Sequence, residues 1–382
     1  MLHETGDPDP MPAASDDHDL RIACEKSFDF SGLDYARLFE AAATGAFAHP
    51  LWLDTFYAML APARGAAPVI VTGRHPDGRL AFVLPLILRR VQGIRLLEAT
   101  DLGVSDYAAP VIDPASRPAL AADTTLAARI RAVLPGHDML RLRPVRPESV
   151  ADWRLFLAAE PEPADFSAHA ATLSAPYADW RRTAFSRSFQ KYLDRRKKRL
   201  LKNPAVRLDR LEGQAAAEAV HRLRDLRSGR FDGDPIQTPD VARFYAAIAE
   251  RGSGAGFCAL YRLSEGDTPI AYVFALTEGE RLLYLLIGAD YDNFGRHSPG
   301  LVLYDLMMED WLARGGRIFD FTIGDEDFKA DFGTAPTPMF ILTGTPTVLG
   351  RAARLVFAIR EKLRRLRGVM LRRTVSTKTS ET

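Results

Sequence analysis

The sequence has little cysteine, no long apolar run and no excess of one charge. Its 382 residues include only two cysteines, Cys24 and Cys258, which lie far apart and have no metal-ligand spacing. Neither a disulfide framework nor a zinc site is expected, and a reducing cytoplasm is the simplest location. No uninterrupted apolar run reaches the roughly 18 residues that a membrane-spanning helix needs. Fifty basic against forty-nine acidic residues leave a net charge of +1, which argues against a dedicated nucleic-acid binder.

The composition is that of an ordinary globular protein. Hydrophobic residues make up 47% and charged residues 26% of the chain, and 382 residues suffice for two domains with separate cores. The first 25 residues are acidic and rich in proline, and they lack the apolar core of a signal peptide. We therefore expect residues 1–25 to form a disordered leader.

The predicted elements occur in the same order twice. The first series has helices over about 28–61, a hairpin closed by His-Pro-Asp-Gly at 75–78, a strand from Ile94, a helix over about 119–134 and a last strand ending near Val145. The second series has a long helix from Tyr177, a strand at 206–211, two helices, three strands, a helix at 301–313 and strands at 317–321 and 339–344. This repetition predicts an α+β protein that arose by internal duplication. The expected boundaries are a leader at 1–25, a first domain at 26–150, a junction at 151–176, a second domain at 177–345, and a basic helix and tail at 346–382.

The stretch from Leu282 to Gly333 has the pattern strand, loop, helix, strand, acidic loop. Its helix follows the turn His-Ser-Pro-Gly, and a helix N-terminus leaves backbone N–H groups free and carries partial positive charge. The turn therefore predicts a phosphate or pyrophosphate site; an ordinary capped helix start is the alternative. The residues expected to form this site are Arg296, Ser298, Pro299, Gly300 and Leu301.

Three motifs in this order resemble one enzyme family. They are GVSDYAAPVIDP at 103–114, HSPGLVLYDLMMEDWLARG at 297–315 and DFTIGDEDFKADFG at 320–333. Together they resemble the GNAT N-acyltransferases of the CelD/BcsL or BioF2-like type, relatives of the tandem Fem-type aminoacyltransferases. In the last motif Asp320, Gly324 and Lys329 match the family pattern, and Phe328 stands where a tyrosine is usual.

The resemblance implies two tandem GNAT-like domains, each with a mixed, mostly antiparallel sheet flanked by helices, followed by the C-terminal amphipathic helix. It implies that the second domain binds acyl-CoA as co-substrate, without a metal, and acylates an amine. The acceptor would be an amino sugar, a glycolipid or a long-chain sphingoid-type amine, as in ceramide formation. The alternatives are a catalytically inactive GNAT-like scaffold in envelope polysaccharide assembly and a Fem-like transferase that uses aminoacyl-tRNA.

Amide formation from a thioester needs a base, an oxyanion donor and an acid for the thiolate. Asp320 or Glu326 is the expected base, and Lys329 is expected to hold a carboxylate or to donate to the oxyanion. His297 is the titrating group beside the helix-opening turn. Asp106 and Tyr107 are expected to bind the acceptor. The alternatives are an Asp320–Lys329 structural ion pair, a hydrogen-bonding histidine and a turn-stabilising aspartate.

Two basic segments remain, at 191–202 and 351–373. The second carries an apolar stripe, so it predicts an amphipathic helix on an anionic membrane surface; packing on its own domain is the alternative. The ordinary interpretation of the first is a solvated helix face. Neither segment interleaves aromatic residues with its charges, which disfavours RNA binding. The expected location is the cytoplasm, with a peripheral position on the cytoplasmic face of the inner membrane as the alternative.

Overall fold

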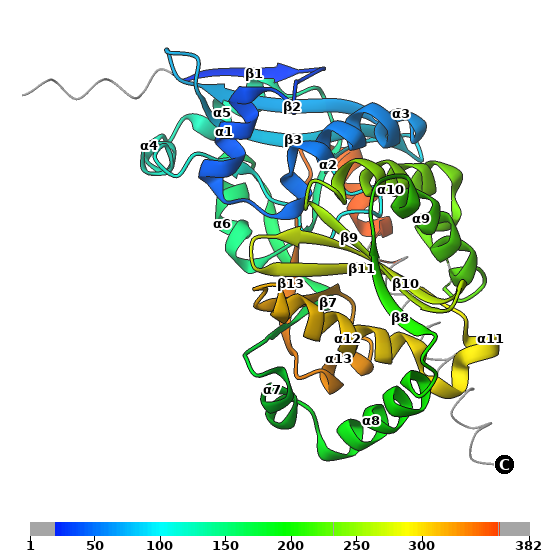
Figure 1. The fold of residues 1–382 in the computed structure, drawn as a ribbon. Helices are drawn as coiled ribbons and strands as arrows, with labels where there is room; N and C mark the ends of the chain where they lie inside the picture. The colour runs from blue at the N-terminus through cyan, green and yellow to red at the C-terminus, as the bar shows by residue number, and fades with distance from the viewer. Residues whose placement is uncertain (1–19, 232, 358, 360–382) are drawn as a thin grey trace, which may run out of the picture.

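The computed structural model describes residues 20–231, 233–357 and 359. Its centre is one mixed sheet of thirteen strands, in the order β1-β2-β3-β4-β6-β13-β7-β12-β11-β10-β9-β8, with β5 beside β3. Helices cover both faces of this sheet (Figure 1). The architecture is therefore α+β with a mixed sheet, as the sequence predicts.

The first half of the chain forms one half of the sheet. Its strands are β1 (Arg21–Glu25), β2 (Ala67–Arg74), β3 (Leu80–Val91), β4 (Ile94–Ala99), β5 (Val111–Ile112) and β6 (Met139–Val145). Its helices are α1 (Leu33–Ala42), η1 (Ala46–Ala48), α2 (Pro50–Thr55), the π-helical η2 (Phe56–Leu60), α3 (Ala61–Ala63), α4 (Arg117–Ala122), α5 (Leu126–Val133) and α6 (Pro147–Phe156).

The second half repeats this plan. The strand β7 (Glu160–Thr172) follows the first half, and the strands of the second half are β8 (Val206–Leu211), β9 (Cys258–Glu265), β10 (Thr268–Glu278), β11 (Arg281–Ala289), β12 (Ile318–Ile323) and β13 (Ala335–Gly344). Its helices are α7 (Tyr177–Ala184), α8 (Arg187–Leu201), α9 (Gly213–Arg227), η3 (Pro235–Gln237), α10 (Pro239–Gly252), α11 (Tyr291–Phe294), η4 (Gly295–His297), α12 (Pro299–Ala313) and α13 (Phe328–Asp331).

Strand pairing confirms the duplicated order of elements. In the first half β2, β3 and β4 are antiparallel neighbours, and β4 then pairs with β6 in parallel. In the second half β9, β10 and β11 are antiparallel neighbours, and β11 then pairs with β12 in parallel. Each parallel pair spans only three residues. Each half therefore contains the same splayed pair of strands.

The two halves exchange their last strands. β7, which follows the first half in sequence, pairs with β12 of the second half, whereas the final strand β13 pairs with β6 of the first half. β7 and β13 also pair with each other at the centre of the sheet. The expectation of two separate sheets is therefore wrong: cross-pairing of the terminal strands makes one continuous sheet.

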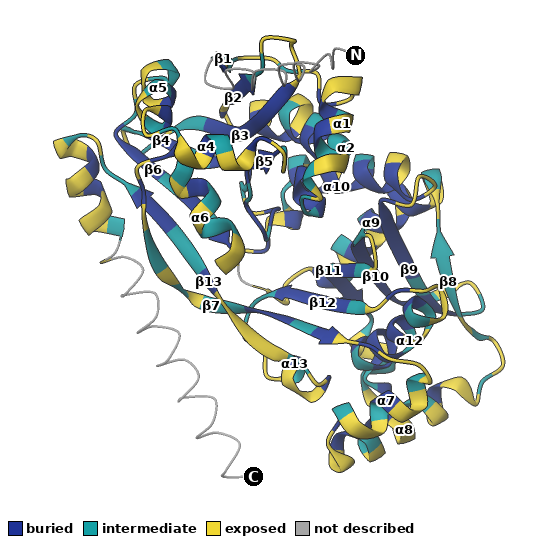
Figure 2. Ribbon diagram, turned by 90° about the vertical axis from the view of Figure 1, so that its left-hand side faces the viewer, coloured by how far each residue is buried: buried dark blue, intermediate teal, exposed yellow. Residues whose placement is uncertain are grey.

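Two helical layers enclose the sheet. One core cluster joins α1, α2, α9 and α10 on one face, and it includes the fully buried Trp52 and Phe244. On the opposite face, α7, α8 and α12 cover the second half and α4 to α6 cover the first. The exposed outer sides of α7 and α8 can be followed in Figure 2. The shared cluster ties the halves together through helices as well as through strands.

Several boundaries differ from the sequence prediction. Residues Arg21–Glu25 of the expected leader form the edge strand β1, because they pair with β2, whereas residues 1–19 lie outside the described residues. The helix expected at 119–134 is interrupted at Asp123, and the long helix expected from Tyr177 is divided at Ser186. Ser186 caps α8, because its Oγ accepts a hydrogen bond from the Phe189 N–H at 3.2 Å.

The segment expected as a junction is ordered. It contains the end of α6 and the whole of β7, at the centre of the sheet. The division of the chain into two domains stays a prediction. Near the C-terminus, residues 348–357 and 359 are helical, and the rest of the predicted basic helix lies outside the described residues. No helix among the described residues is long and apolar enough to cross a membrane.

Candidate active site

The candidate site lies where β11 and β12 separate. The parallel pairing begins with Arg281 opposite Ile318 and ends with Leu283 opposite Asp320, although β11 continues to Ala289. The chain then turns through α11 and η4 into α12, which packs against β10 and β11. One end of the opening thus faces the first half of the chain, and the other faces the N-terminus of α12.

The N-terminus of α12 has no side-chain cap. Ser298 occupies the N-cap position with a left-handed backbone (φ 50°), and its side chain caps no backbone N–H. Instead its Oγ lies 2.6 Å from the hydroxyl of Tyr192 on α8. A side chain at position 300 would lie 2.7 Å from the Tyr291 hydroxyl, so the glycine allows this close approach. The first turn therefore keeps backbone donors for an anion.

Cationic side chains surround this turn. Arg199 on α8, Arg296 and His297 line a groove of about 460 Å³, and among the described residues Glu265 is the one carboxylate in its lining. Burial, followed by the charges of Arg296, Arg199 and Arg196, lowers the pKa of His297. Its Nε2 accepts a hydrogen bond from Arg296 Nε at 3.0 Å, and its buried Nδ1 has no partner. A neutral histidine, an open helix end and two arginines fit a phosphate group.

A buried ionic network holds α8 against α12. Asp305 of α12 is fully buried, and its carboxylate contacts Lys197 Nζ and Arg181 Nε, each at 2.8 Å. The hydroxyl of Tyr177 also donates to Asp305 Oδ1 at 2.9 Å. Because a buried carboxylate is costly without partners, this network fixes the position of α8 beside the phosphate groove.

The other end of the opening receives a loop from the first half. Hydrogen bonds hold the loop at 101–110 to its own half, including those from the Ala108 N–H to the Pro144 carbonyl at 2.7 Å and from Trp153 Nε1 to the Ala108 carbonyl at 3.1 Å. This anchoring carries Asp106 and Tyr107 to β12. The sequence prediction that the first-half loop reaches the second half therefore agrees with the structure.

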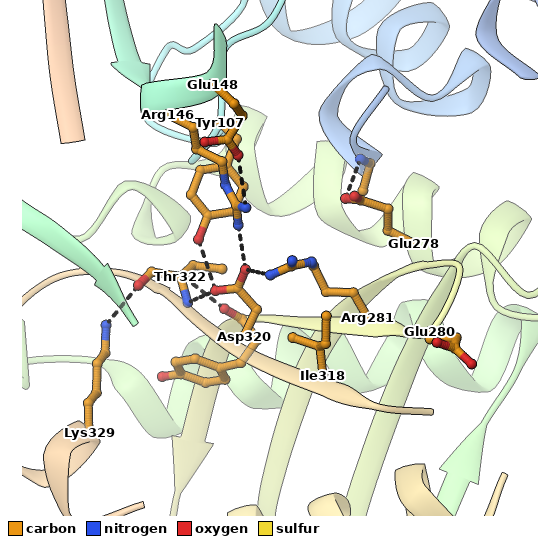
Figure 3. Close-up of polar contacts among 12 residues, drawn as sticks. Tyr107, Arg146, Glu148, Glu278, Glu280, Arg281, Ile318, Asp320, Thr322 and Lys329 are labelled. Atoms are coloured by element: carbon orange, nitrogen blue, oxygen red, sulfur yellow. Dashed lines mark hydrogen bonds and ion pairs between the residues drawn. The ribbon is translucent and has the colours of Figure 1, made fainter. Parts of the chain in front are cut away.

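Asp320 is the centre of the contacts between the halves (Figure 3). Its Oδ1 accepts from the Tyr107 hydroxyl at 2.9 Å and from the Thr322 N–H at 2.8 Å. Its Oδ2 accepts from Arg146 at 2.6 Å and from Arg281 at 2.8 Å. The Arg146 guanidinium also lies 3.7 Å from the centre of the Tyr107 ring. Because both oxygens are occupied, Asp320 positions its neighbours and has no free lone pair directed at a substrate.

Asp106 is the carboxylate best suited to accept a proton. Burial raises its pKa to about 7, with smaller contributions from Asp101 and Asp320, while the Thr322 hydroxyl and Lys329 lower it. A base with a pKa near neutrality combines a populated carboxylate with useful basicity. The sequence predicts Asp106 as an acceptor-binding residue, and its position beside Thr322 places it at the start of the opening.

Backbone irregularities occur on both strands at this point. The pairing of β10 with β11 shifts register between Phe274 and Ala275, so that Leu285 is left over as a bulge. On β12, Thr322 has a positive φ of 55°, and its hydroxyl donates to the Tyr284 carbonyl at 3.0 Å. Bulges redirect backbone N–H groups and are frequent next to active sites. The bulge therefore supplies a candidate oxyanion donor.

Two tyrosines lie behind the bulge. The rings of Tyr284 on β11 and Tyr304 on α12 pack edge to face, with centres 5.0 Å apart. Burial raises the pKa of Tyr284 to about 12 and that of Tyr304 well above its ordinary value, so both keep their protons. They are candidate donors to a leaving thiolate. Sequence analysis missed them because each resembles an ordinary core aromatic residue.

Lys329 is buried at the end of β12. Its ammonium donates to the Ile323 and Gly324 carbonyls at 2.8 and 2.9 Å and pairs with Glu326 at 2.9 Å. It does not contact Asp320, so the alternative of an Asp320–Lys329 ion pair is wrong. Lys329 holds the loop after β12 in place, and Glu326, with a half-exposed side chain, serves as its partner.

Replacing Lys329 by methionine is expected to lower the free energy of unfolding by about 2–3 kcal/mol, because buried carbonyls and a carboxylate lose a charged donor. Urea denaturation measures this change, with Lys191→Met on the exposed side of α8 as control. Unchanged stability combined with lost activity would instead mean that Lys329 acts on substrate, as the resemblance implies.

The predicted catalytic residues do not meet at one point. Ala289 lies six positions beyond Leu283, the residue opposite Asp320, and at ~3.3 Å per position the two are about 20 Å apart along β11. His297 lies beyond Ala289, at the phosphate groove. One reacting atom therefore cannot contact both His297 and Asp320. Sequence analysis also missed Arg146 and Arg281, whose partner Asp320 is distant in sequence.

A cavity of about 360 Å³ lies on the first-half side of Arg146 and Tyr107. Six of the residues that line it are alanines, whose small side chains leave space for a ligand. The Nε atom of Arg146 is buried and has no hydrogen-bond partner among the described residues. Among the charged groups that line the cavity, three are carboxylates and two are guanidinium groups: Glu148, Asp152, Glu278, Arg117 and Arg146. The excess of carboxylate favours a ligand with an ammonium group.

One protein-family model matches part of the chain. Residues 187–330 match the family described as "Acetyltransferase (GNAT) domain". No curated protein sequence matches the chain.

Solved structures match over most of the chain. FemX aligns with a TM-score of 0.53 and 13% identity, covering 76% of this chain and 91% of FemX. The structure of L-PGS from Bacillus licheniformis aligns with a TM-score of 0.52 and 10% identity, covering 84% and 94%. A tandem GNAT protein from the clavulanic acid biosynthesis pathway aligns with a TM-score of 0.49 and 14% identity, covering 86% and 98%. At these identities, the first two likenesses establish the shared fold alone.

Proposed function

We propose that this chain, a GNAT-family acyltransferase through its domain at 187–330, transfers the acyl group of acyl-CoA to an amine held between the two halves of the sheet. The observation that carries the proposal is the distance between two clusters along β11. A phosphate-binding groove lies at one end, and a carboxylate and a backbone bulge lie at the other. A donor with its phosphates and its thioester at opposite ends of an extended arm fits this spacing.

The protein holds acyl-CoA by the phosphate end of that substrate. The first-turn N–H groups of α12 receive the pyrophosphate, and Arg199, Arg296 and His297 provide charge and a hydrogen-bond donor. The pantetheine arm follows β11 where it has separated from β12. The thioester then lies near Leu285 and Thr322.

The reaction joins the amine nitrogen to the thioester carbonyl carbon and breaks the carbon–sulfur bond. Asp106 removes the proton from the attacking ammonium, and a backbone N–H at the Leu285 bulge donates to the oxyanion. Tyr284 or Tyr304 protonates the leaving thiolate, and the second proton that the amine nitrogen loses as the amide forms returns to the tyrosine. Asp320 acts through Tyr107, Arg146 and Arg281 and is a positioning residue.

The acceptor is an amine on an envelope or lipid-related molecule, either an amino sugar, a glycolipid head or a long-chain sphingoid-type amine. The cavity beside Arg146 supports a polar head group, because its lining is charged and its volume is at the lower end of the ~300–1,000 Å³ range of ligand sites. A lipid chain would have to extend outside this cavity.

The test is release of free thiol from short- and long-chain acyl-CoA in the presence of a panel of amino sugars and sphingoid-type amines. Mass spectrometry of the N-acylated product identifies the acceptor, and calorimetry measures CoA binding separately. CoA binding without thiol release for any amine would support the inactive scaffold. Absence of both would exclude acyl-CoA as donor.

A second candidate donor is aminoacyl-tRNA. One observation favours it: the exposed side of α8, next to the phosphate groove, carries six cationic residues, Arg187, Lys191, Arg195, Lys198, Arg199 and Lys202. Such a surface attracts a polyanion. Aminoacyl-tRNA offered with the same amines distinguishes the two donors, because only one of them should yield an amide product.

Replacing Arg199 by glutamate is expected to raise the Kd for CoA roughly 10- to 100-fold, because a charge-assisted phosphate contact is lost and a repulsive charge is added. Calorimetry measures the change. The matched control is Arg187→Glu, at the other end of the same helix. Equal affinity of the two variants would place the CoA phosphates elsewhere.

A further inference from the structure

Exposed apolar side chains gather on the C-terminal helix, residues 348–357 and 359. Ten large hydrophobic side chains are exposed among the described residues, and five of them belong to this helix. The five are Val348, Leu349, Leu355, Val356 and Ile359, with exposed fractions of 75%, 53%, 64%, 45% and 51%. Single exposed apolar residues are normal, whereas a cluster of them marks an interaction surface, so we expect this face to bind a partner.

The five residues share one face of the helix. At 100° per residue, the spacings 348, 355, 359 and 349, 356 place all of them within about 120°. The opposite face is fixed to the first half of the protein, where Ala353 and Phe357 pack with Leu96 and Met139. The apolar face is therefore held outward by a packed back face.

A close backbone contact reinforces this anchoring. A side-chain carbon at Gly350 would lie 1.7 Å from the Asp138 carbonyl oxygen, so only glycine allows the helix to approach β6 this closely. Thr347 donates to Asp138 at 3.3 Å and accepts from the Gly350 N–H at 3.0 Å. Arg354 pairs with Glu162 of β7.

The sequence that follows is strongly cationic. Residues 351–373 contain nine lysines and arginines and one glutamate. The spacing of Leu363, Leu366 and Met370 continues the period of the apolar face, although residues 360–382 lie outside the described part of the chain. Two copies of such a segment would repel each other, whereas anionic lipid headgroups attract each lysine or arginine by roughly 1 kcal/mol.

We propose that the C-terminal helix docks this protein on an anionic membrane surface, with the face of Val348, Leu355 and Ile359 in the headgroup boundary. The apolar side chains contribute burial, and the sequence after Ile359 adds positive charge that anionic headgroups attract. Because the start of the helix is fixed to the first half of the protein, docking of the helix also orients the first half relative to the membrane. This inference does not depend on the acyl donor or acceptor.

The test is co-sedimentation of the full-length protein with phosphatidylcholine vesicles, with and without phosphatidylglycerol. Binding is expected to anionic vesicles and to weaken with added salt. Leu355→Asp/Ile359→Asp should lower vesicle affinity roughly 10-fold or more, and Arg364→Glu/Arg365→Glu should remove most of the preference for phosphatidylglycerol. Leu33→Asp, at an exposed apolar position on α1, is the matched control and should bind as the wild type does.

Circular dichroism and thermal unfolding establish that each variant folds. Equal vesicle binding by the wild type and Leu355→Asp/Ile359→Asp would overturn the proposal, as would equal binding to neutral and anionic vesicles. A dimer in solution that dissociates in Leu355→Asp/Ile359→Asp, without vesicle binding by the wild type, would overturn it and make this face an interface between two copies.

Discussion

Replacing Asp106 by asparagine is expected to lower kcat for acyl transfer roughly 10²- to 10⁴-fold, the range that a general base contributes. The amide keeps the size of the side chain but cannot accept the proton. The measurement is steady-state thiol release with the acceptor found in the panel. A change confined to KM would instead assign Asp106 to acceptor binding, as the sequence predicts.

The same variant should be more stable than the wild type above neutral pH. The carboxyl pKa rises from an ordinary 3.8 to about 7 on folding. Between these values the folded protein binds a proton that the unfolded chain does not, so the wild type loses stability as pH rises through this window. The stability of Asp106→Asn does not depend on pH in this way, because the amide does not titrate. We therefore expect the melting temperature of Asp106→Asn to exceed that of the wild type increasingly from pH 4 to 7.

The pH profile of activity supplies an independent check. The wild-type kcat/KM should rise with pH through about 7 as the carboxylate forms. Asp106→Asn should lack this limb. A limb that persists unchanged in the variant would contradict the assignment of Asp106 as the base.

Replacing Asp320 by alanine is expected to lower the free energy of unfolding by about 3–5 kcal/mol, the cost of leaving buried charges without a partner. Arg146 and Arg281 both lose their shared carboxylate, and Tyr107 loses its acceptor. Urea denaturation measures the effect. Asp325→Ala, at a half-exposed carboxylate in the loop that follows β12, is the control and should change stability by less than ~1 kcal/mol.

The milder Asp320→Asn separates positioning from catalysis. Its kcat should fall because Tyr107 and the loop that carries Asp106 lose their anchor, but the pH limb near 7 should remain. Loss of that limb in Asp320→Asn, together with its retention in Asp106→Asn, would make Asp320 the base.

Local patterns account for the elements that the sequence predicts well. The β2–β3 hairpin follows from the Asp77-Gly78 turn between apolar runs, and α12 follows from a helix-opening Pro-Gly turn and a continuous helical pattern. β7 was missed because its sequence contains Pro161, Pro163 and several alanines, which are poor strand formers. Its strand structure comes from pairing with β12 and β13, which lie far away in sequence.

The candidate site divides in the same way. The open N-terminus of α12 could be predicted because Arg296 to Leu301 are contiguous and a helix N-terminus needs only local sequence; that it binds phosphate stays a prediction. The role of Asp106 could not be predicted, because its pKa is raised by burial against residues of the second half, which follow more than 200 positions later in the sequence. Asp320 looked like a base because its partners, Tyr107 and Arg146, lie 213 and 174 residues away.

By itself the sequence determined the repeated α+β elements, the open helix N-terminus, the GNAT resemblance and the cationic C-terminal segment, since each depends on neighbouring residues. Only the tertiary structure decided that the halves share one sheet, that Asp320 is saturated by hydrogen bonds and that the pKa of Asp106 is raised to about 7. The physical reason is that burial and partner choice set the charge state of a carboxylate, and both are established by strands and loops brought together from opposite halves of the chain.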